Sequence, residues 1–439
     1  LSTNREANNY VLHSAKERDV KFIRLWFTDI LGTLKGFAIT VDELEEVLSR
    51  GATIDGSSIA GFARSDEADM IAMPDPSTWQ LLPWRPKEKS VARMFCDILR
   101  PDGSPFEGDP RHVLHRNVQE AANMGFTFYL APEMEYFYLK GPDFTQPLDD
   151  GGYFDQASDD AGTDLRRDTV LSLEELGIPV AHSHHEVAPG QHEIDLRHMN
   201  ALTMADTVVT YRVVAKEIAA QRGIYASFMP RPFNDRNGSG MHCHMSLFNG
   251  DDNAFYDSED EERLSATGRQ FIAGLLRHAA EITAVTNQWV NSYKRLVPGT
   301  EAPAYTVWSG ANWADLVRVP AYQGRPEAVR VEYRAPDAAC NPYLAFSVIL
   351  AAGLKGIREG YEIAGPGGHA SNGQWKTLGV SRLPSNLGEA LHATRSSELV
   401  KSALGESVFD NFIENKDIEW REYQETVTDY EFERYLKIL

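Results

Sequence analysis

Three segments of the chain alternate charged or polar side chains with apolar ones, which is the period-2 pattern of β-strands. The three polar rows are Glu133 and Glu135; His242, His244 and Ser246; and Arg330, Glu332 and Arg334. One such strand is most simply a half-exposed antiparallel strand whose charges face solvent. Three of them in one chain indicate instead a sheet that gathers chemically active groups on one face.

Carboxylates are prominent in these rows and in the segment between the first two. Residues 182–195 add Glu186 and Glu193 on either side of a Pro-Gly turn. Carboxylate oxygens with an occasional imidazole are the ligands that hard divalent cations prefer. The three cysteines lack the paired spacing of a structural zinc site. The pattern therefore predicts a site for Mg²⁺ or Mn²⁺.

Arginines accompany these predicted metal ligands. Arg330 and Arg334 flank Glu332, and residues 291–303 add Arg295 and a loop that carries Glu301. In phosphoryl transfer, metal ions bridge phosphate oxygens and fixed guanidinium groups neutralise the developing charge. The sequence has neither a Walker motif nor a GxGxxG motif after a strand, which argues against a P-loop or Rossmann site. These residues alone predict a Mg²⁺- or Mn²⁺-dependent enzyme that acts on a phosphate.

The overall charge narrows the choice of partners. The 439 residues carry 64 acidic and 43 basic side chains, a formal net charge of −21. This balance argues against nucleic acid and against anionic membranes as partners, whereas clustered arginines still accommodate a small anion. The longest apolar run, residues 342–354, is too short to span a bilayer. Three scattered cysteines and a polar N-terminus without a signal-peptide pattern predict a cytoplasmic location.

The length of the chain exceeds what one simple core needs, so we expect two domains, residues 1–105 and 106–439. Residues 8–100 have the pattern of a small α/β unit. The remainder alternates strands and helices without a βαβ rhythm. The predicted fold class is therefore α+β, with an antiparallel sheet.

Local signals place several boundaries. Asp29–Gly32 is the predicted turn of a hairpin. Thr40–Glu43 has the Thr-x-x-Glu form of a capping box, and Gly51 marks the predicted end of the helix that follows. Asp109 and Pro110 are the predicted N-cap and first position of a longer amphipathic helix.

Seven segments in this order resemble the type I glutamine synthetase family, and the resemblance covers nearly the whole chain. They are residues 55–62 (DGSSIAGF), 132–137 (PEMEYF), 184–195 (HHEVAPGQHEID), 237–247 (NGSGMHCHMSL), 291–299 (NSYKRLVPG), 301–303 (EAP) and 330–346 (RVEYRAPDAACNPYLAF). As an ordered set, these motifs are highly specific.

The resemblance implies a fold, an assembly and a reaction. The expected fold is a small N-terminal β-grasp domain and a large catalytic domain whose antiparallel sheet is flanked by helices. The expected assembly is a dodecamer of two stacked hexamers, with each active site shared between neighbouring subunits. The expected reaction uses ATP and two or three Mg²⁺ or Mn²⁺ ions to form γ-glutamyl phosphate from glutamate, which ammonia then attacks.

By the same resemblance, two metal sites and a phosphate site are expected. Glu135, Glu186 and Glu193 would hold one metal, and Glu133, His242 and Glu332 the second. Arg295 and Arg334 would hold glutamate and the transferring phosphoryl group, with Arg318 and Arg330 also facing phosphate. Asn237 and Gly238 would contact the amino acid, and His244 and Ser246 would lie at the nucleotide.

The ammonium pocket and its closure are implied in the same way. Asp55 of the adjacent subunit would accept a proton from ammonium, in a pocket lined by Ser58, Tyr153 and Glu186. Glu301 would lie on a flap that closes over glutamate. Ammonium becomes a nucleophile only when it loses a proton, and the acyl phosphate must be kept from water, so both functions are chemically required.

The sequence departs from the family pattern at three places. Trp313 stands where an arginine that faces phosphate is usual, and Thr300 stands where a tyrosine is usual. Residues 366–379 replace the segment that is adenylylated in some relatives and contain no tyrosine, so adenylylation is not expected. Arg64 matches a feedback-inhibition position of one subgroup, although an exposed loop arginine is the simpler interpretation.

These departures leave three functions open. The first is ligation of ammonia, which the presence of Asp55, Ser58, Tyr153 and Glu186 favours. The second is ligation of a larger amine, such as a polyamine, ethanolamine or another alkylamine. The third is an impaired homologue with a structural or regulatory role, against which the complete set of predicted metal ligands argues.

Overall fold

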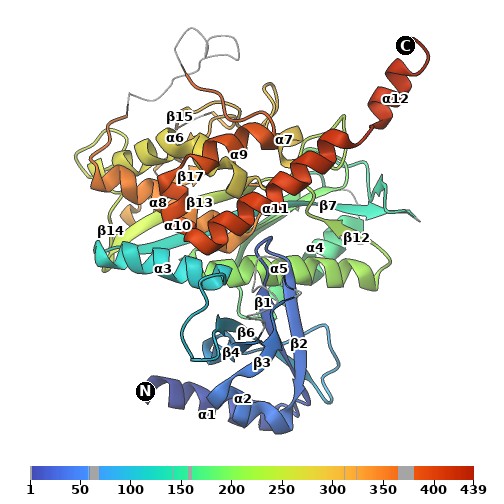
Figure 1. Cartoon of the computed structure of the whole chain (residues 1–439), viewed down its shortest axis with the longest axis vertical. Coiled ribbons are helices and arrows are strands. Elements are labelled where there is room, and N and C mark those ends of the chain that lie inside the picture. The colour runs from blue at the N-terminus through green and yellow to red at the C-terminus, as the bar shows by residue number, and fades with distance from the viewer. Residues whose placement is uncertain are drawn as a thin grey trace.

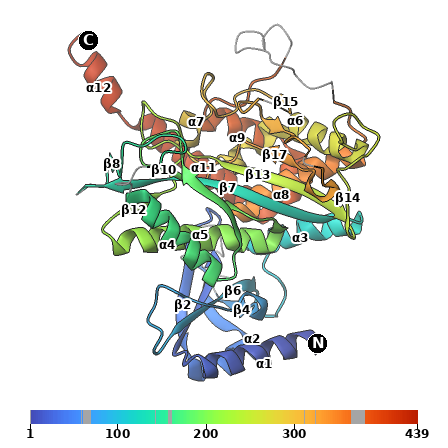
Figure 2. The same ribbon diagram turned by 180° about the vertical axis from the view of Figure 1, so that it is seen from behind.

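The computed structural model describes residues 2–57, 59, 69–141, 143–156, 161–310, 312–322, 324–363 and 380–439. The chain forms a small N-terminal domain and a large C-terminal domain (Figure 1). Helices α3 (Pro110–Asn123) and α5 (Ala201–Gln221) lie between the small domain and the sheet of the large domain in both ribbon views (Figures 1 and 2). No helix among the described residues is both long and apolar enough to cross a membrane.

The small domain is built on a six-stranded sheet. Its main path runs β2-β1-β6-β4-β3, and β5 also pairs with β6. The described pairings are antiparallel except for the parallel pair of β1 and β6. The elements are α1 (Ser2–Glu17), β1 (Phe22–Thr28), β2 (Leu34–Thr40), α2 (Leu44–Arg50), β3 (Ala52–Asp55), β4 (Asp69–Pro74), β5 (Gln80–Leu81) and β6 (Val91–Leu99), with 3₁₀ turns at Val41–Glu43 and Pro76–Thr78. This is the expected β-grasp domain.

The hairpin of β1 and β2 turns where the sequence predicts. The Asp29 carboxylate accepts hydrogen bonds from the backbone N–H groups of Leu31 and Thr33, at 3.0 and 2.9 Å. Gly32 adopts φ 77°, a conformation that side chains disfavour. A Cβ atom there would also lie 2.7 Å from the Cα atom of Asn341, so this glycine lets the turn dock on the large domain.

The predicted capping box at Thr40 is wrong. The chain enters a 3₁₀ turn at Val41–Glu43 before α2 begins at Leu44, and the Thr40 side chain makes no capping hydrogen bond. The end of α2 at Gly51 is confirmed, because this glycine has φ 74° and its N–H donates to the carbonyl of Val47. The predicted start of the next helix is also confirmed, with Asp109 capping α3.

The large domain is built on an 11-stranded sheet with the main path β15-β16-β17-β13-β7-β10-β9. Its described pairings are antiparallel except for β15 with β16. The strands are β7 (Thr127–Lys140), β8 (Gln146–Pro147), β9 (Val180–His185), β10 (Gln191–Leu196), β11 (Met199–Asn200), β12 (Tyr225–Ser227), β13 (Met241–Asn249), β14 (Asp252–Asn253), β15 (Trp308–Ser309), β16 (Val317–Arg318) and β17 (Val331–Tyr333).

Helices cover the apolar face of this sheet. Besides α3 and α5, the helices of this domain are α4 (Ala161–Glu175), α6 (Ala266–Thr286), α7 (Ser292–Arg295), α8 (Pro342–Arg358), α9 (Leu387–Arg395), α10 (Glu398–Leu404), α11 (Glu406–Glu425) and α12 (Asp429–Tyr435), the last of which projects away from the sheet (Figure 1). On β7, Phe128, Leu130 and Met134 are fully buried in the core between sheet and helices. By alternation, the side chains of Glu133 and Glu135 therefore project from the opposite face.

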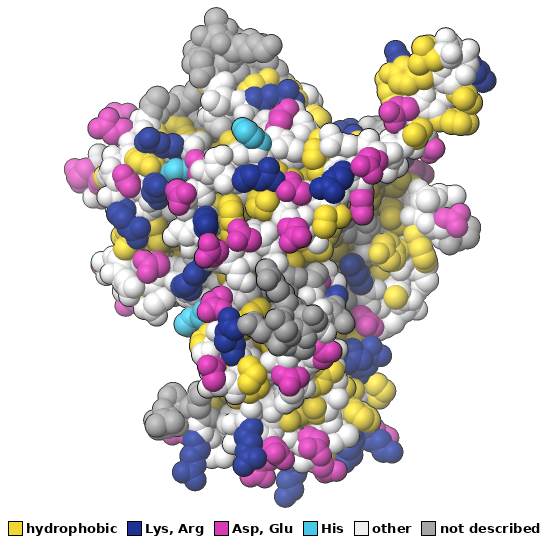
Figure 3. Space-filling view, viewed as in Figure 1, with side chains coloured by type: hydrophobic (Ala, Val, Ile, Leu, Met, Phe, Trp, Pro, Cys, Tyr) yellow, Lys and Arg dark blue, Asp and Glu magenta, His cyan; other side chains and the backbone are white. Residues whose placement is uncertain are grey.

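An ionic cluster joins the two domains. Arg111, at the start of α3, pairs with Asp75 and Asp97 of the small domain and with Asp206 of α5. The surface seen in Figure 3 intersperses basic with acidic side chains, and the projecting α12 shows hydrophobic ones. The fold thus leaves the polar face of the large sheet, remote from the small domain of the same chain, as the place to look for a site.

Candidate active site

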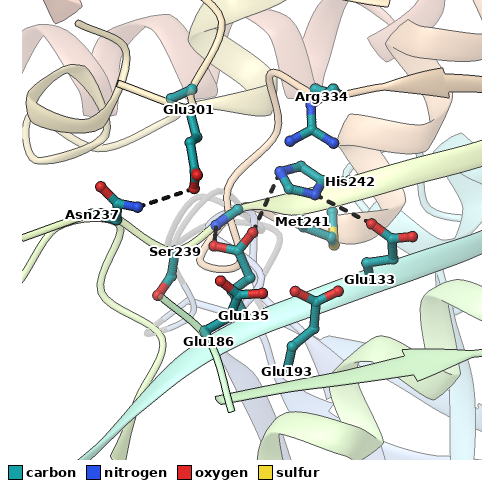
Figure 4. Close-up of polar contacts among 12 residues, drawn as sticks. Glu133, Glu135, Glu186, Glu193, Asn237, Ser239, Met241, His242, Glu301 and Arg334 are labelled. Atoms are coloured by element: carbon teal, nitrogen blue, oxygen red, sulfur yellow. Dashed lines mark hydrogen bonds and ion pairs between the residues drawn. The ribbon is translucent and has the colours of Figure 1, made fainter. Parts of the chain in front are cut away.

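Strand register brings the polar rows of the sequence onto one surface. Glu133 of β7 lies opposite Asp195 of β10 on one side and His242 of β13 on the other. Glu135 lies opposite Glu193 of β10. Directly opposite residues of an antiparallel pair point to the same face, so these side chains converge, as Figure 4 shows for four of them.

The row continues into the next strands. His244 of β13 lies opposite Glu332 of β17, and Glu332 lies opposite Arg318 of β16. Ligand atoms of Glu133, His242 and Glu332 lie within 4.8 Å of one another, which is close enough for a single cation. The predicted second metal set is therefore together in space.

Glu133 and His242 of this set have the protonation states that suit a metal site. His242 Nδ1 lies 3.3 Å and His244 Nε2 lies 2.6 Å from the carboxylate of Glu133. Burial opposes ionisation of Glu133, but these histidines outweigh it and hold the pKa of Glu133 well below its usual value. Burial and the Arg334 charge lower the pKa of His242 to about 4, so its ring is neutral at pH 7 and able to bind a metal.

Glu135, Glu186 and Glu193 form the neighbouring carboxylate set. All three are buried. His184 of β9 lies between two of them, 3.7 Å from Glu186, which directly follows β9, and 3.9 Å from Glu193 of β10. Burial and the Glu186 charge raise the pKa of Glu135 to about 8. Burial and the Asp195 carboxylate raise the pKa of Glu193 well above its usual value.

Raised carboxylate pKa values are the result of packing like charges in a buried place, and a cation relieves that repulsion. The donor set is all oxygen and imidazole, which fits Mg²⁺ or Mn²⁺. The spacing of Glu133, His242 and Glu332 and the chemistry of both sets therefore fit divalent cations.

Two arginines border the Glu332 end of the row. Arg318 donates to one carboxylate oxygen of Glu332 at 2.5 Å, and Arg334 pairs with the other. Glu332 is fully buried, so the view of this strand as half-exposed is wrong for its charged face. Among the described residues, Nε of Arg334 has no hydrogen-bond partner, which leaves a donor for a ligand.

The indole of Trp313 covers this arginine pair. The Cζ atoms of Arg318 and Arg334 lie 3.8 and 5.3 Å from the centroid of the Trp313 ring. The Trp313 side chain is 55% exposed, so its outer face is open to solvent. The residue that replaces the usual arginine thus contacts the two remaining arginines directly.

A pocket opens beside the carboxylates. The residues that line it include Glu135, Glu186, Gln191, Asn237, Gly238, His242, Arg295, Thr300, Glu301 and Arg334. Arg295 is buried and donates to the carbonyls of Ala335 and Arg334 at 2.7 and 3.1 Å, which fixes its charge in place. The Glu301 carboxylate accepts a hydrogen bond from Asn237 at 3.0 Å across the pocket mouth (Figure 4).

The remaining predicted residues lie around this centre. Arg330 donates to His244 Nδ1 at 3.0 Å, just before β17 begins, and Ser246 is half-buried on β13. Tyr153 is exposed, and its ring packs edge-on to His184 at 5.6 Å. Burial and the Glu186 charge raise the pKa of Tyr153, which places this phenol beside the carboxylates.

Asp55 is not brought to the site by its own chain. It ends β3 in the small domain, on the far side of the α3 and α5 layer (Figure 1). Its exposed carboxylate accepts a hydrogen bond from the Ser57 N–H at 2.9 Å. Ser58, Arg64 and the 366–379 segment lie outside the described residues.

Sequence reasoning missed three residues of this surface. Asp195 lies opposite Glu133, Gln191 donates to Glu135 at 3.2 Å, and His184 bridges two carboxylates. Gln191 and Asp195 share the β10 face with Glu193, so extending the period-2 pattern by two residues in each direction would have found both. His184 lies opposite Glu193 on β9, and only the strand register shows this.

Comparison with known proteins agrees with this geometry. Residues 19–101 match the glutamine synthetase β-grasp domain, and residues 107–435 match the glutamine synthetase catalytic domain. A glutamine synthetase of Mycolicibacterium smegmatis is 53% identical over 443 residues, covering 98% of this chain and 99% of the relative. One of Methanosarcina mazei is 48% identical over 437 residues, covering 98% and 97%.

A solved structure also matches the fold of this chain. The GmaS/ADP complex superposes with a TM-score of 0.90 at 30% identity, covering 97% of this chain and 99% of that chain. The two domains, the shared architecture and the identity over the full length leave one conclusion: this chain belongs to the glutamine synthetase family.

Proposed function

We propose that this protein is an ATP-dependent ligase that joins ammonia to the γ-carboxylate of glutamate. The observation that carries the proposal is the continuity of one surface. The cation-binding carboxylates end at Glu332, Glu332 pairs with Arg334, and Arg334 also lines the pocket that contains Arg295 and Glu301. A phosphate bound at the carboxylates would thus lie next to an amino acid bound in the pocket.

In this proposal the two carboxylate sets would hold divalent cations, which would supply positive charge against the phosphate groups of ATP. Arg295 and Arg334 bind the anionic groups of glutamate and of the transferring phosphoryl group. Both guanidinium groups are buried and held by protein oxygens, so they are oriented before the substrate arrives.

The reaction proceeds in two steps. A γ-carboxylate oxygen of glutamate attacks the γ-phosphorus of ATP, and ADP leaves. Ammonia then attacks the γ-carbonyl carbon, and phosphate leaves with the C–O bonding pair. The ammonium proton passes to a carboxylate beforehand, which we assign to Asp55. Glu301 and its loop lie at the pocket mouth, where closure would keep water from the acyl phosphate.

Asp55 reaches the site only from a second copy of the chain. In one chain, strand β3, which ends at Asp55, lies beyond the helical layer that backs the sheet (Figure 1). Glu186 lies among the site carboxylates (Figure 4), and Tyr153 packs against His184 of β9. We therefore propose an assembly in which neighbouring subunits complete each other's sites. A dodecamer of two stacked hexamers, the arrangement that the family resemblance implies, meets this requirement.

A larger amine is the second candidate, and one feature favours it. The rings of Tyr153 and Phe154 stack with centroids 4.0 Å apart, and both are more than half exposed next to His184 and the buried Glu186. Aromatic faces beside carboxylates attract alkylammonium groups. This surface would contact the carbon chain of a larger amine, a group that ammonia lacks.

A panel of amines decides between these functions. The purified protein is given ATP, Mg²⁺, glutamate and either ammonia, methylamine, ethanolamine, putrescine or spermine, and phosphate release is measured together with the mass of the product. The highest kcat/KM is expected with ammonia. A higher value with another amine would replace the first candidate by the second, and no release with any amine would support a structural or regulatory homologue.

A further inference from the structure

A second carboxylate–histidine cluster lies behind the proposed amine pocket, and its three residues, Asp149, His185 and His192, have no role in the proposed mechanism. Asp149 accepts hydrogen bonds from His185 Nε2 at 2.7 Å and from the backbone N–H of Gly190 at 2.8 Å. His192 Nε2 lies 3.3 Å from its other oxygen. His185 and His192 are 1% and 0% exposed, so this cluster is part of the interior and not a surface arrangement.

The protonation of His192 follows from its neighbours. Arg166 of α4 brings Nη1 to 2.5 Å from His192 Nδ1. A guanidinium group only donates, so Nδ1 is the acceptor and the ring proton lies on Nε2, which faces Asp149.

The spacing of the cluster also matches that of a metal site, because one ligand atom of each residue lies within 4.8 Å of the others. The surroundings argue against a metal there. Arg166 already supplies a positive charge in contact with His192, and both His185 Nδ1 and an Asp149 oxygen are engaged with backbone groups. The cluster is therefore better explained as a structural support for the segments that it connects.

Asp149 connects the two segments that line the proposed amine pocket. On one side, Gly151 N–H donates to Asp149 at 3.1 Å, two residues before Tyr153. On the other side, His185 contacts the Glu186 carbonyl through Nδ1 at 2.6 Å. Gly190 closes the far end of the 186–190 loop on the same carboxylate.

The segment with Tyr153 is tied to the Glu186 strand a second time. Phe154 N–H donates to the carbonyl of His185 at 3.1 Å. Phe154 does so with φ 62°, a conformation that a side chain of this size adopts only when its surroundings enforce it. The relative position of Tyr153 and Glu186 is thus fixed through His185, and His185 is fixed by Asp149.

We propose that Asp149 is a positioning residue that sets the distance between Tyr153 and Glu186 and so sets the affinity of the enzyme for its amine. The proposal rests on the proposed function, because it assumes that these two side chains bind the amine. Asp149 touches no substrate and acts through His185 and through the two glycine N–H groups.

The test variant is Asp149→Asn, which keeps the size of the side chain. Its amide places an N–H group toward either His185 or His192, and His192 cannot switch its proton because Arg166 occupies Nδ1. We expect KM for the amine to rise about tenfold or more, in the range typical of lost supporting hydrogen bonds. KM for ATP and for glutamate should rise less, although Glu186 is also a predicted metal ligand and lines the pocket with Arg295 and Glu301.

Glu281→Gln is the matched control. Glu281 is a half-buried carboxylate on α6 that binds His278 Nδ1 at 2.9 Å and the Ser397 hydroxyl at 2.5 Å, within the helical layer. The Glu281→Gln variant loses a carboxylate–histidine contact of the same kind. Its KM values for the amine, ATP and glutamate are expected to stay unchanged. An equal rise of all three KM values in Asp149→Asn, or an unchanged KM for the amine, would overturn the proposal.

A second variant covers the case in which Asp149→Asn does not fold. A Cβ atom at Gly151 would lie 2.7 Å from His185 Nε2, so Gly151→Ala pushes this histidine away while Asp149 stays in place. The same selective rise in KM for the amine is expected, and its absence would contradict the proposal.

A crystal structure of whichever variant folds gives a readout that does not depend on turnover. A displaced Glu186 carboxylate or Tyr153 ring supports the inference even if the wild-type protein ligates no amine, in which case the proposed function alone has failed. Unmoved side chains refute the inference.

Discussion

Two substitutions of Glu332 distinguish the effect of its negative charge from the effect of its size. The side chain is fully buried, and its carboxylate pairs with Arg318 and Arg334. Removing one partner of a buried ion pair costs about 3–5 kcal/mol, because a charge remains without a partner. We expect Glu332→Ala to lower the free energy of unfolding by about that amount. Glu332→Gln should lose less, because its amide oxygen still accepts a hydrogen bond from one arginine.

Metal-dependent stability then tests the role of Glu332 as a ligand. A ligand present at about 100 times its Kd stabilises the folded state by about 2.7 kcal/mol. An unfolding entropy of about 2.1 cal/mol/K per residue over 439 residues is about 0.9 kcal/mol/K, so Mg²⁺ should raise the wild-type Tm by about 3 °C. Glu332→Gln should need at least tenfold more Mg²⁺ for the same rise, as measured by thermal unfolding across a Mg²⁺ series.

Glu281→Gln serves again as the control, because its carboxylate lies in the helical layer and should leave the Mg²⁺ dependence of Tm unchanged. Phosphate release is measured on the same samples and should be lost in Glu332→Gln at every Mg²⁺ concentration. A Glu332→Gln protein with the wild-type Mg²⁺ dependence of both Tm and turnover would refute the assignment of Glu332 to a metal site.

Binding of Mg²⁺ at pH 7 should release protons, because burial and the Glu186 charge raise the pKa of Glu135 to about 8 and a bound cation favours the ionised carboxylate. The affinity for Mg²⁺ should therefore rise as the pH approaches 8. Calorimetry in buffers of different ionisation enthalpy measures the protons, and a buffer-independent heat would contradict the prediction. Mixed oligomers of inactive Asp55→Ala and inactive Glu332→Gln subunits should regain part of the activity, whereas proven mixed oligomers without activity would count against a shared site. Trp313→Ala should lower kcat/KM for ATP about two- to fivefold, because an exposed cation–π contact is worth about 0.5–1 kcal/mol, while Trp313→Phe should retain most of it. Equal values for wild type and Trp313→Ala would show that the indole does not orient the arginines.

The sequence predicts the members of the polar face better than it predicts their neighbours. Alternation alone places Glu133 with Glu135 and His242 with His244, because a strand has only two faces. Alternation does not say which strands are adjacent, so the pairing of Glu133 with Asp195 had no signal beyond the two-residue spacing in β10. Contacts between strands distant in the sequence come only from the fold or from a family resemblance.

Burial and short turns account for the other differences. A charged row on a strand is ordinarily solvated, yet Glu332 is fully buried because two arginines satisfy both of its oxygens. The Thr-x-x-Glu spacing at Thr40 satisfies the capping-box pattern, but a 3₁₀ turn delays the helix to Leu44. In both cases the local pattern was real, and a competing interaction decided the structure.

Trp313 shows how the structure changes the meaning of a substitution. In the sequence, its replacement of an arginine reads as the loss of a cation from the phosphate site, as a contact for a larger amine or as a filler of space. The structure places the indole over Arg318 and Arg334, so its first effect is on the two cations that remain. An aromatic face removes water from a guanidinium group without neutralising it, and it narrows the directions in which the group can point. If a phosphate binds beside Arg318 and Arg334, this orientation would reduce the reorganisation needed as negative charge develops.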